Sequence, residues 1–133
     1  MGDDGSIVVR KALRRAQLLL FFRELPPRNG ESAESGPIGA LGVPLTARRS
    51  IAVDPRFITL GAPVFLATAM PNSEIPLARL MFAQDTGGAI RGPVRADFFW
   101  GFGADAGSLA GSMRQQGSMW ELLPRGVTPT QAP

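Results

Sequence analysis

The chain has 133 residues, of which 44% are hydrophobic and 19% are charged, values that are ordinary for one compact globular domain. It has no cysteine and no histidine, which excludes disulfides, thiol nucleophiles, the usual Cys/His zinc sites and a Ser-His-Asp triad. Acid–base chemistry therefore falls to Asp or Glu. The net charge of +3 is modest, and Phe and Arg do not interleave as a nucleic-acid platform would require.

The N-terminal segment, residues 1–20, is predicted to be helical and amphipathic. From Val8 to Leu20, apolar residues recur at helical spacing on one face and basic residues occupy another, which is typical of a surface helix. Met1–Ser6 carries two Asp and no basic residue, so we expect no secretory signal here. No run approaches the ~18 to 20 apolar residues that a membrane-spanning helix needs.

Residues 21–123 have the pattern of one small β domain. We expect a strand at Phe21–Leu25 and then a loop rich in Pro and Gly that ends near Pro37. A helix is predicted over Ala104–Gln115, ending at Gly117, and the tail 124–133 is expected to be disordered. Short apolar runs separated by Gly or Pro predict further strands at Ser50–Val53, Pro63–Ala67, Leu77–Ala83, Val94–Trp100 and Ser118–Leu123. This pattern predicts a mainly β fold, a closed or partly closed barrel with one or two peripheral helices.

Two carboxylates stand close to glycine and are the candidates for chemistry. Asp85 ends an apolar run before Gly87 and Gly88, and Asp97 lies inside another apolar run. Loss of hydration in such surroundings raises the pKa of a carboxyl group and favours the protonated form that a general acid needs. From the pattern alone, a turn cap is the simpler interpretation of Asp85, and an outward-facing strand position is an alternative for Asp97. Asp54 precedes a proline, a turn signal that indicates a structural role.

Five ordered motifs carry a resemblance to a known family. They are Phe21-Phe22-Arg23-Glu24, Gly39 to Leu45, Ala52 to Ile58 with Leu60-Gly61, Ala83 to Gly92, and Asp97 to Gly101. Together they resemble the 3D domain, named for three aspartates, in the form found at the C-terminus of the membrane-bound lytic murein transglycosylase A family. This resemblance implies a six-stranded double-psi β-barrel. It also implies cleavage of the β-1,4 bond between N-acetylmuramic acid and N-acetylglucosamine in peptidoglycan, leaving a 1,6-anhydromuramoyl end, with no cofactor and no metal.

The resemblance also implies roles for individual residues. Asp97 matches the third aspartate, the catalytic acid and base; Asp85 matches the second, a supporting catalytic residue; and Asp54 matches the first and is expected to be structural. One carboxylate suffices because the sugar's own C6 hydroxyl attacks C1, so no water enters. We expect substrate binding in the loop after Asp85, at Thr86, Gly87, Gly88, Ala89 and Arg91.

The expected partner is the glycan strand of peptidoglycan, not nucleic acid, and the expected location is the bacterial envelope, in the periplasm and associated with the outer membrane. The family's substrate groove lies between two domains, so we expect either a homodimer or a missing N-terminal half to complete it. Two other readings stay open. Asp85-Thr86-Gly87 is also the signature tripeptide of aspartic proteases, in a chain short enough for a retroviral-type dimer. A glycan-binding barrel without catalysis is the second.

Overall fold

The computed structural model describes residues 6–8 and 36–127. The predicted helix Val8–Leu20, apart from Val8, lies outside the described residues, as do the strand Phe21–Leu25 and the last six residues of the predicted disordered tail. Within the described ranges, no helix is long and apolar enough to cross a bilayer. The elements are β1 (Ser6–Val8), β2 (Ser50–Val53), β3 (Pro63–Ala69), β4 (Pro76–Asp85), β5 (Ala96–Phe98), α1 (Gly103–Ser112) and β6 (Gln116–Glu121).

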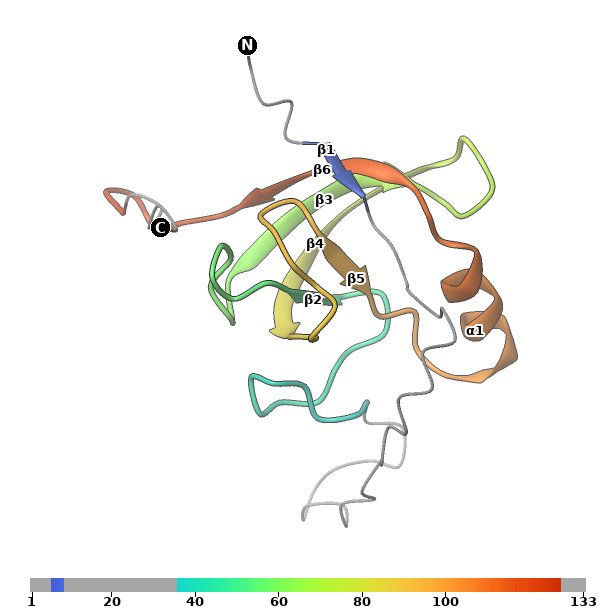
Figure 1. The fold of residues 1–133 in the computed structure, drawn as a ribbon, viewed down its shortest axis with the longest axis horizontal. Helices are drawn as coiled ribbons and strands as arrows, with labels where there is room; N and C mark the ends of the chain where they lie inside the picture. Colours follow the sequence, from blue (N-terminus) through green and yellow to red (C-terminus); the bar gives the residue numbers. More distant parts are fainter. Residues whose placement is uncertain (1–5, 9–35, 128–133) are drawn as a thin grey trace.

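The strands form one sheet in the order β1-β6-β3-β4-β2-β5, which curls around its concave side (Figure 1). All neighbours are antiparallel except β2 and β4, which run parallel. The mainly β fold is therefore confirmed. The six-stranded double-psi barrel is not confirmed, because β1 and β5 are the two edges of the sheet and, in the described part of the chain, no pairing joins them.

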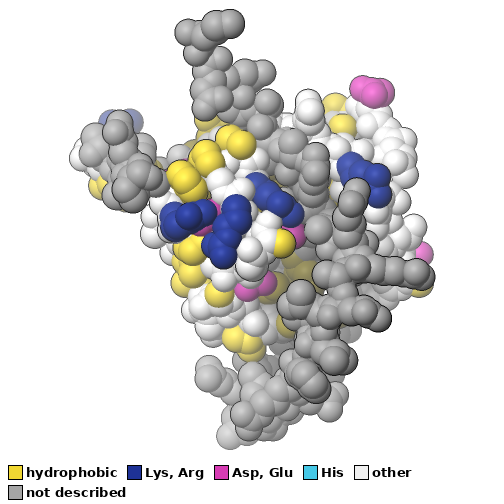
Figure 2. Space-filling view, in the orientation of Figure 1, with side chains coloured by type: hydrophobic (Ala, Val, Ile, Leu, Met, Phe, Trp, Pro, Cys, Tyr) yellow, Lys and Arg dark blue, Asp and Glu magenta, His cyan; other side chains and the backbone are white. Residues whose placement is uncertain are grey.

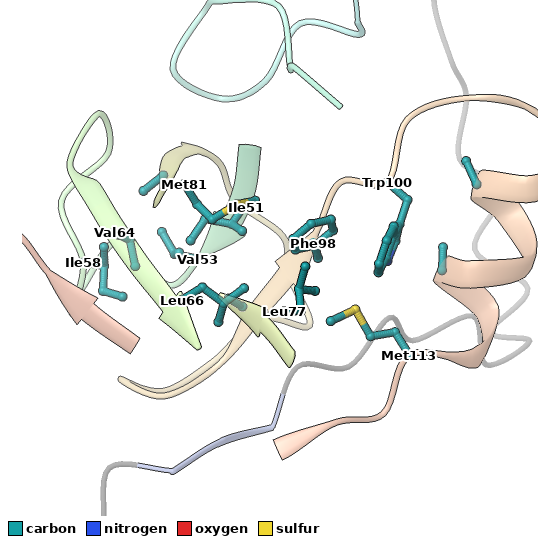
Figure 3. Packing of buried hydrophobic residues seen from close by; sticks show 14 residues of the cluster. Ile51, Val53, Ile58, Val64, Leu66, Leu77, Met81, Phe98, Trp100 and Met113 are labelled. Carbon is teal, nitrogen blue, oxygen red and sulfur yellow. The ribbon is translucent and has the colours of Figure 1, made fainter. Parts of the chain in front are cut away.

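The core fills the concave side of the sheet. In β3, Val64 and Leu66 are buried while Phe65 between them is partly exposed, the alternation expected of a strand with one buried face. Helix α1 adds Ala106 and Ala110, one turn apart, to the same cluster. Figure 3 shows Trp100 between Phe98 and α1, so the aromatic residues after β5 connect the sheet to the helix.

The C-terminal part differs from the sequence prediction at Gly117. This glycine was expected to end the helix, but α1 ends at Ser112 and Gly117 lies inside β6. A Cβ at Gly117 would come within 2.5 Å of the Ala67 carbonyl oxygen of β3. Glycine is needed there because the backbones of β6 and β3 approach closely, a use of glycine that sequence alone does not distinguish from a helix stop.

Candidate active site

Asp85 and Asp97 are brought together by strand register around Ala52. In the sheet, Ala52 of β2 is paired on one side with Asp85 of β4 and on the other with Asp97 of β5. Two strand spacings therefore separate the aspartates, about 10 Å between their Cα atoms. The small side chain of Ala52 leaves the space between the two carboxylates open. All three residues line one cleft.

A β-bulge at the end of β4 determines which residue faces Ala52. Ile51 pairs with Ala83, but Ala52 pairs with Asp85, so Gln84 is the extra residue. Its side-chain carbonyl oxygen accepts a hydrogen bond of 2.5 Å from the Ser50 hydroxyl. A bulge of this kind re-aims a side chain at a strand end. Here it places the carboxylate, and not the amide, beside the cleft.

The carboxylate of Asp85 is held by a turn that precedes β2. Its Oδ1 accepts a hydrogen bond of 2.9 Å from the Ala40 amide. The turn is fixed to β4 by a second bond, from the Leu41 amide to the Gln84 carbonyl oxygen. Gly39 makes this approach possible, because a Cβ there would lie 2.4 Å from the Gln84 carbonyl oxygen. The Gly39 to Leu45 motif thus positions Asp85.

The cleft has a volume of about 510 Å³ and a largely apolar wall. Part of the wall comes from the segment after β5, with Phe99, Trp100 and Phe102, and from the small residues of α1. Trp100 is buried against Phe98, with ring centroids 4.5 Å apart. Its Nε1 group is buried and makes no hydrogen bond with the described residues. The sequence analysis placed Phe99 and Trp100 in a predicted strand and a family motif but gave Phe102 no role; the glycines on both sides of Phe102, Gly101 and Gly103, were the available signal.

Asp54 lies outside the cleft and holds the loop between β4 and β5. It is 1% exposed, and its carboxylate accepts bonds from the Arg56 side chain, at 3.0 and 2.6 Å, and from the Gly92 amide at 2.9 Å. The Arg56 guanidinium, aided by the backbone amides of Gly92 and Arg56, holds the pKa of Asp54 well below its usual range, although burial opposes this shift. Figure 2 shows several basic side chains, all of them Arg among the described residues, gathered on one face of the molecule.

The predicted site residues are brought together only in part. Asp97, Asp85, Thr86 and Gly87 line the cleft. Gly88, Ala89 and Arg91 do not; they are exposed in the outer part of the loop. Among the described residues, no group of three or more acidic side chains is arranged to hold a metal ion. The catalytic and substrate-binding roles of these residues remain predictions.

Comparison with known proteins defines the class of this fold and cleft. The family model of the 3D domain matches residues 49–123. The curated membrane-bound lytic murein transglycosylase A of Vibrio cholerae serotype O1 is 30% identical over 98% of this chain and 34% of its own length. That of Escherichia coli K12 is 38% identical over 86% of this chain and 30% of its own.

Solved structures agree with this class. LtgG, a lytic transglycosylase of Burkholderia pseudomallei, is 61% identical with a TM-score of 0.69, covering 80% of this chain and 30% of its own. MltA from Neisseria gonorrhoeae is 52% identical with a TM-score of 0.71, covering 74% of this chain and 26% of its own. The chain belongs to the 3D-domain family, in the form found in membrane-bound lytic murein transglycosylase A. It spans about a third of the length of the curated relatives it matches.

Proposed function

We propose that the chain is the catalytic segment of a peptidoglycan lytic transglycosylase, with Asp97 as its acid and base. The observation that carries the proposal is the register in which Asp97 and Asp85 flank Ala52 in one cleft. Family membership supports it. One of the similar structures, E. coli MltA, 32% identical with a TM-score of 0.59, was crystallised with bound chitohexaose. That supports a glycan as the ligand of this cleft.

In the proposed reaction, protonated Asp97 gives its proton to the glycosidic oxygen between N-acetylmuramic acid and N-acetylglucosamine, and the C1–O bond breaks. The carboxylate of Asp97 then takes the proton of the C6 hydroxyl, and O6 bonds to C1 to form the 1,6-anhydro ring. One carboxylate thus serves twice, unlike the pair that most glycoside hydrolases require. Asp85, held by the Ala40 amide, supports the site, and Thr86 and Gly87 contact the sugar.

The proposal extends to the fold and the location of the protein. The curled sheet is taken as the main part of a six-stranded double-psi barrel. The substrate is taken as the glycan strands of peptidoglycan, and the location as the bacterial envelope. Both follow from the name of the similar curated proteins, membrane-bound lytic murein transglycosylase A. Asp54 is given a structural role, as the anchor of the loop through Gly92.

Digestion of purified sacculi tests the proposal. The wild-type chain is expected to release 1,6-anhydromuropeptides, detected by mass, and Asp97→Asn is expected to lower this release at least 100-fold, a typical contribution of general acid–base catalysis. Asp105→Asn, an exposed aspartate on α1 outside the cleft, is the matched control and should retain full activity.

Three other results would contradict the proposal. Absence of anhydro products from the wild type, with unchanged sacculus binding by Asp97→Asn, would favour the non-catalytic glycan-binding barrel. Proteolysis sensitive to pepstatin and lost in Asp85→Asn would favour the aspartic protease. Products that end in a reducing sugar would mean hydrolysis by water instead of attack by the C6 hydroxyl.

A further inference from the structure

We propose that Phe102 is a sugar-stacking residue of the cleft, the platform on which a pyranose ring of the glycan lies while the bond beside Asp97 is cut. The inference deepens the proposed function and rests on it. Phe102 and Asp97 line the same cleft. Phe102 lies five positions after Asp97 in the chain, so their Cα atoms are at most about 17 Å apart.

Phe102 is unusually exposed for an aromatic residue. Its side chain is 65% exposed, although phenylalanine is normally buried. Trp100, two residues earlier, is 5% exposed and belongs to the core, so this short segment contains one buried and one exposed aromatic residue. An aromatic ring left in water loses the free energy of burial that its neighbour gains. A ring that faces a cleft can regain that free energy when a ligand covers it.

The backbone on both sides of Phe102 takes conformations that favour glycine. Gly101 has φ of +107° and Gly103 has φ of +89°, conformations that disfavour residues with side chains. The rings of Phe99 and Phe102 also pack edge to face, with their centroids 5.7 Å apart and an angle of 84° between their planes. The contact with Phe99 restricts the orientation of the Phe102 ring, which lowers the entropy cost of binding a ligand on it.

Phe102 also stands at a position where the helix favours a different residue. It is the N-cap of α1, with φ of −115° and ψ of 166°, and within the described part of the chain no side-chain hydrogen bond caps the helix. Ser, Thr, Asp and Asn are preferred there because their oxygens accept bonds from the first free amides. A local rule broken without a structural gain is typical of a functional position. Phenylalanine at this position leaves the helix without a side-chain cap and places an aromatic ring in the lining of the cleft.

The chemistry of the ring defines the ligand class. The faces of β-linked hexopyranoses carry axial C–H groups with partial positive charge, and these match the negative face of an aromatic ring. Such contacts suit uncharged sugar rings, including the N-acetylglucosamine units of peptidoglycan and of chitin oligomers. The small residues Ala106 and Gly107 of α1 leave room for a flat ligand in the same cleft.

Binding of chitohexaose, measured by calorimetry in an Asp97→Asn background to prevent turnover, tests the inference. Phe102→Ala is expected to raise the Kd about tenfold, which corresponds to about 1.4 kcal/mol. Phe102→Trp should restore binding, and Phe102→Leu, which keeps apolar bulk but removes the ring, should not. The matched control is Phe65→Ala, since Phe65 is a partly exposed phenylalanine outside the cleft. It should bind as the parent does.

Equal binding by Phe102→Ala and the parent would overturn the inference and leave the proposed function intact. Equal restoration by leucine and tryptophan would overturn the stacking role, because bulk alone would then suffice. Failure of the parent to bind chitohexaose would also overturn the inference, while the sacculus digestion would still decide the proposed function separately.

Discussion

At the scale of single residues, Asp54 shows how one buried carboxylate organises a distant loop. It accepts a hydrogen bond from the Gly92 amide, which joins residues that are 38 positions apart in the chain. Gly92, with φ of +101°, belongs to the loop between β4 and β5, the strand in which Asp97 lies. Asp54 thus contributes to the site through the shape of the loop, without entering the cleft.

The depressed pKa of Asp54 predicts that its contribution to stability depends on pH. A carboxyl group whose pKa is lower in the folded than in the unfolded protein stabilises the fold above the unfolded value, near 3.8, and loses this effect as the pH falls. We expect Asp54→Asn to lower Tm at pH 7 by several degrees. The difference in Tm between wild type and variant should shrink between pH 5 and 2.

Thermal unfolding followed by circular dichroism across this pH range is the measurement. Asp105→Asn, on the exposed surface of α1, is the control and should change Tm little at any pH. A gap between wild type and Asp54→Asn that stayed constant or grew in acid would contradict the role of the ionised carboxylate.

Local sequence patterns and the family resemblance pointed to Asp54, Asp85 and Asp97 among the eleven acidic residues of the chain. It could not show that Ala52 stands between two of them, since that depends on pairing across β2. Phe102 was missed for a related reason. Its exposure results from the turn at Gly101 and Gly103, whose positive φ is a property of the folded backbone.

At the scale of elements, the strands were the most predictable part. The bounds of β2 agree with the predicted Ser50–Val53, and β3 and β4 begin within one residue of their predicted starts. β5 is shorter than the predicted Val94–Trp100, because only Ala96–Phe98 pairs with β2. β1 was not predicted at all, since three residues carry too little periodicity to be recognised.

The turn around Gly39 gives a prediction at this scale. Gly39→Ala would place a Cβ 2.4 Å from the Gln84 carbonyl oxygen and 2.7 Å from the Leu45 side chain. We expect destabilisation of about 1–3 kcal/mol, the usual cost of overpacking. Glycan binding should also weaken, because the displaced turn would no longer hold Asp85 through Ala40.

A matched glycine-to-alanine change tests whether the effect is specific. Gly107→Ala lies inside α1 and would meet no atom within 4 Å, so it should stabilise the fold by about 0.5–1 kcal/mol through helix propensity. Urea unfolding of both variants is the measurement. Equal stability of Gly39→Ala and wild type would show that the turn yields and does not fix Asp85.

At the scale of the whole molecule, the sequence predicted a mainly β domain but not the order of its strands. The deciding pair, β2 and β4, runs parallel and joins segments more than thirty residues apart. Local patterns describe which face of a strand is buried, but they contain no information on which distant strand will be its neighbour. The cleft follows from that pairing, and so its lining could be named only in part.

The place of β5 at the edge of the sheet affects how readily this strand opens in the folded protein. This strand has three residues, forms one edge of the sheet and pairs with β2 alone, whereas β3 and β4 share seven paired positions. Short edge elements open locally at a lower free energy than the centre of a sheet. The strand that carries Asp97 should therefore open more readily than β3 and β4.

Amide hydrogen exchange should detect this order, with faster exchange in β5 than in β3. Urea should abolish chitohexaose binding at a lower concentration than it removes the far-ultraviolet signal of the sheet, while exchange as slow in β5 as in β3 would contradict the idea. In such a molecule, inactivation precedes unfolding. A partner or substrate that lies across β5 would then act as a clamp, protecting the carboxylate during the moments when it is used.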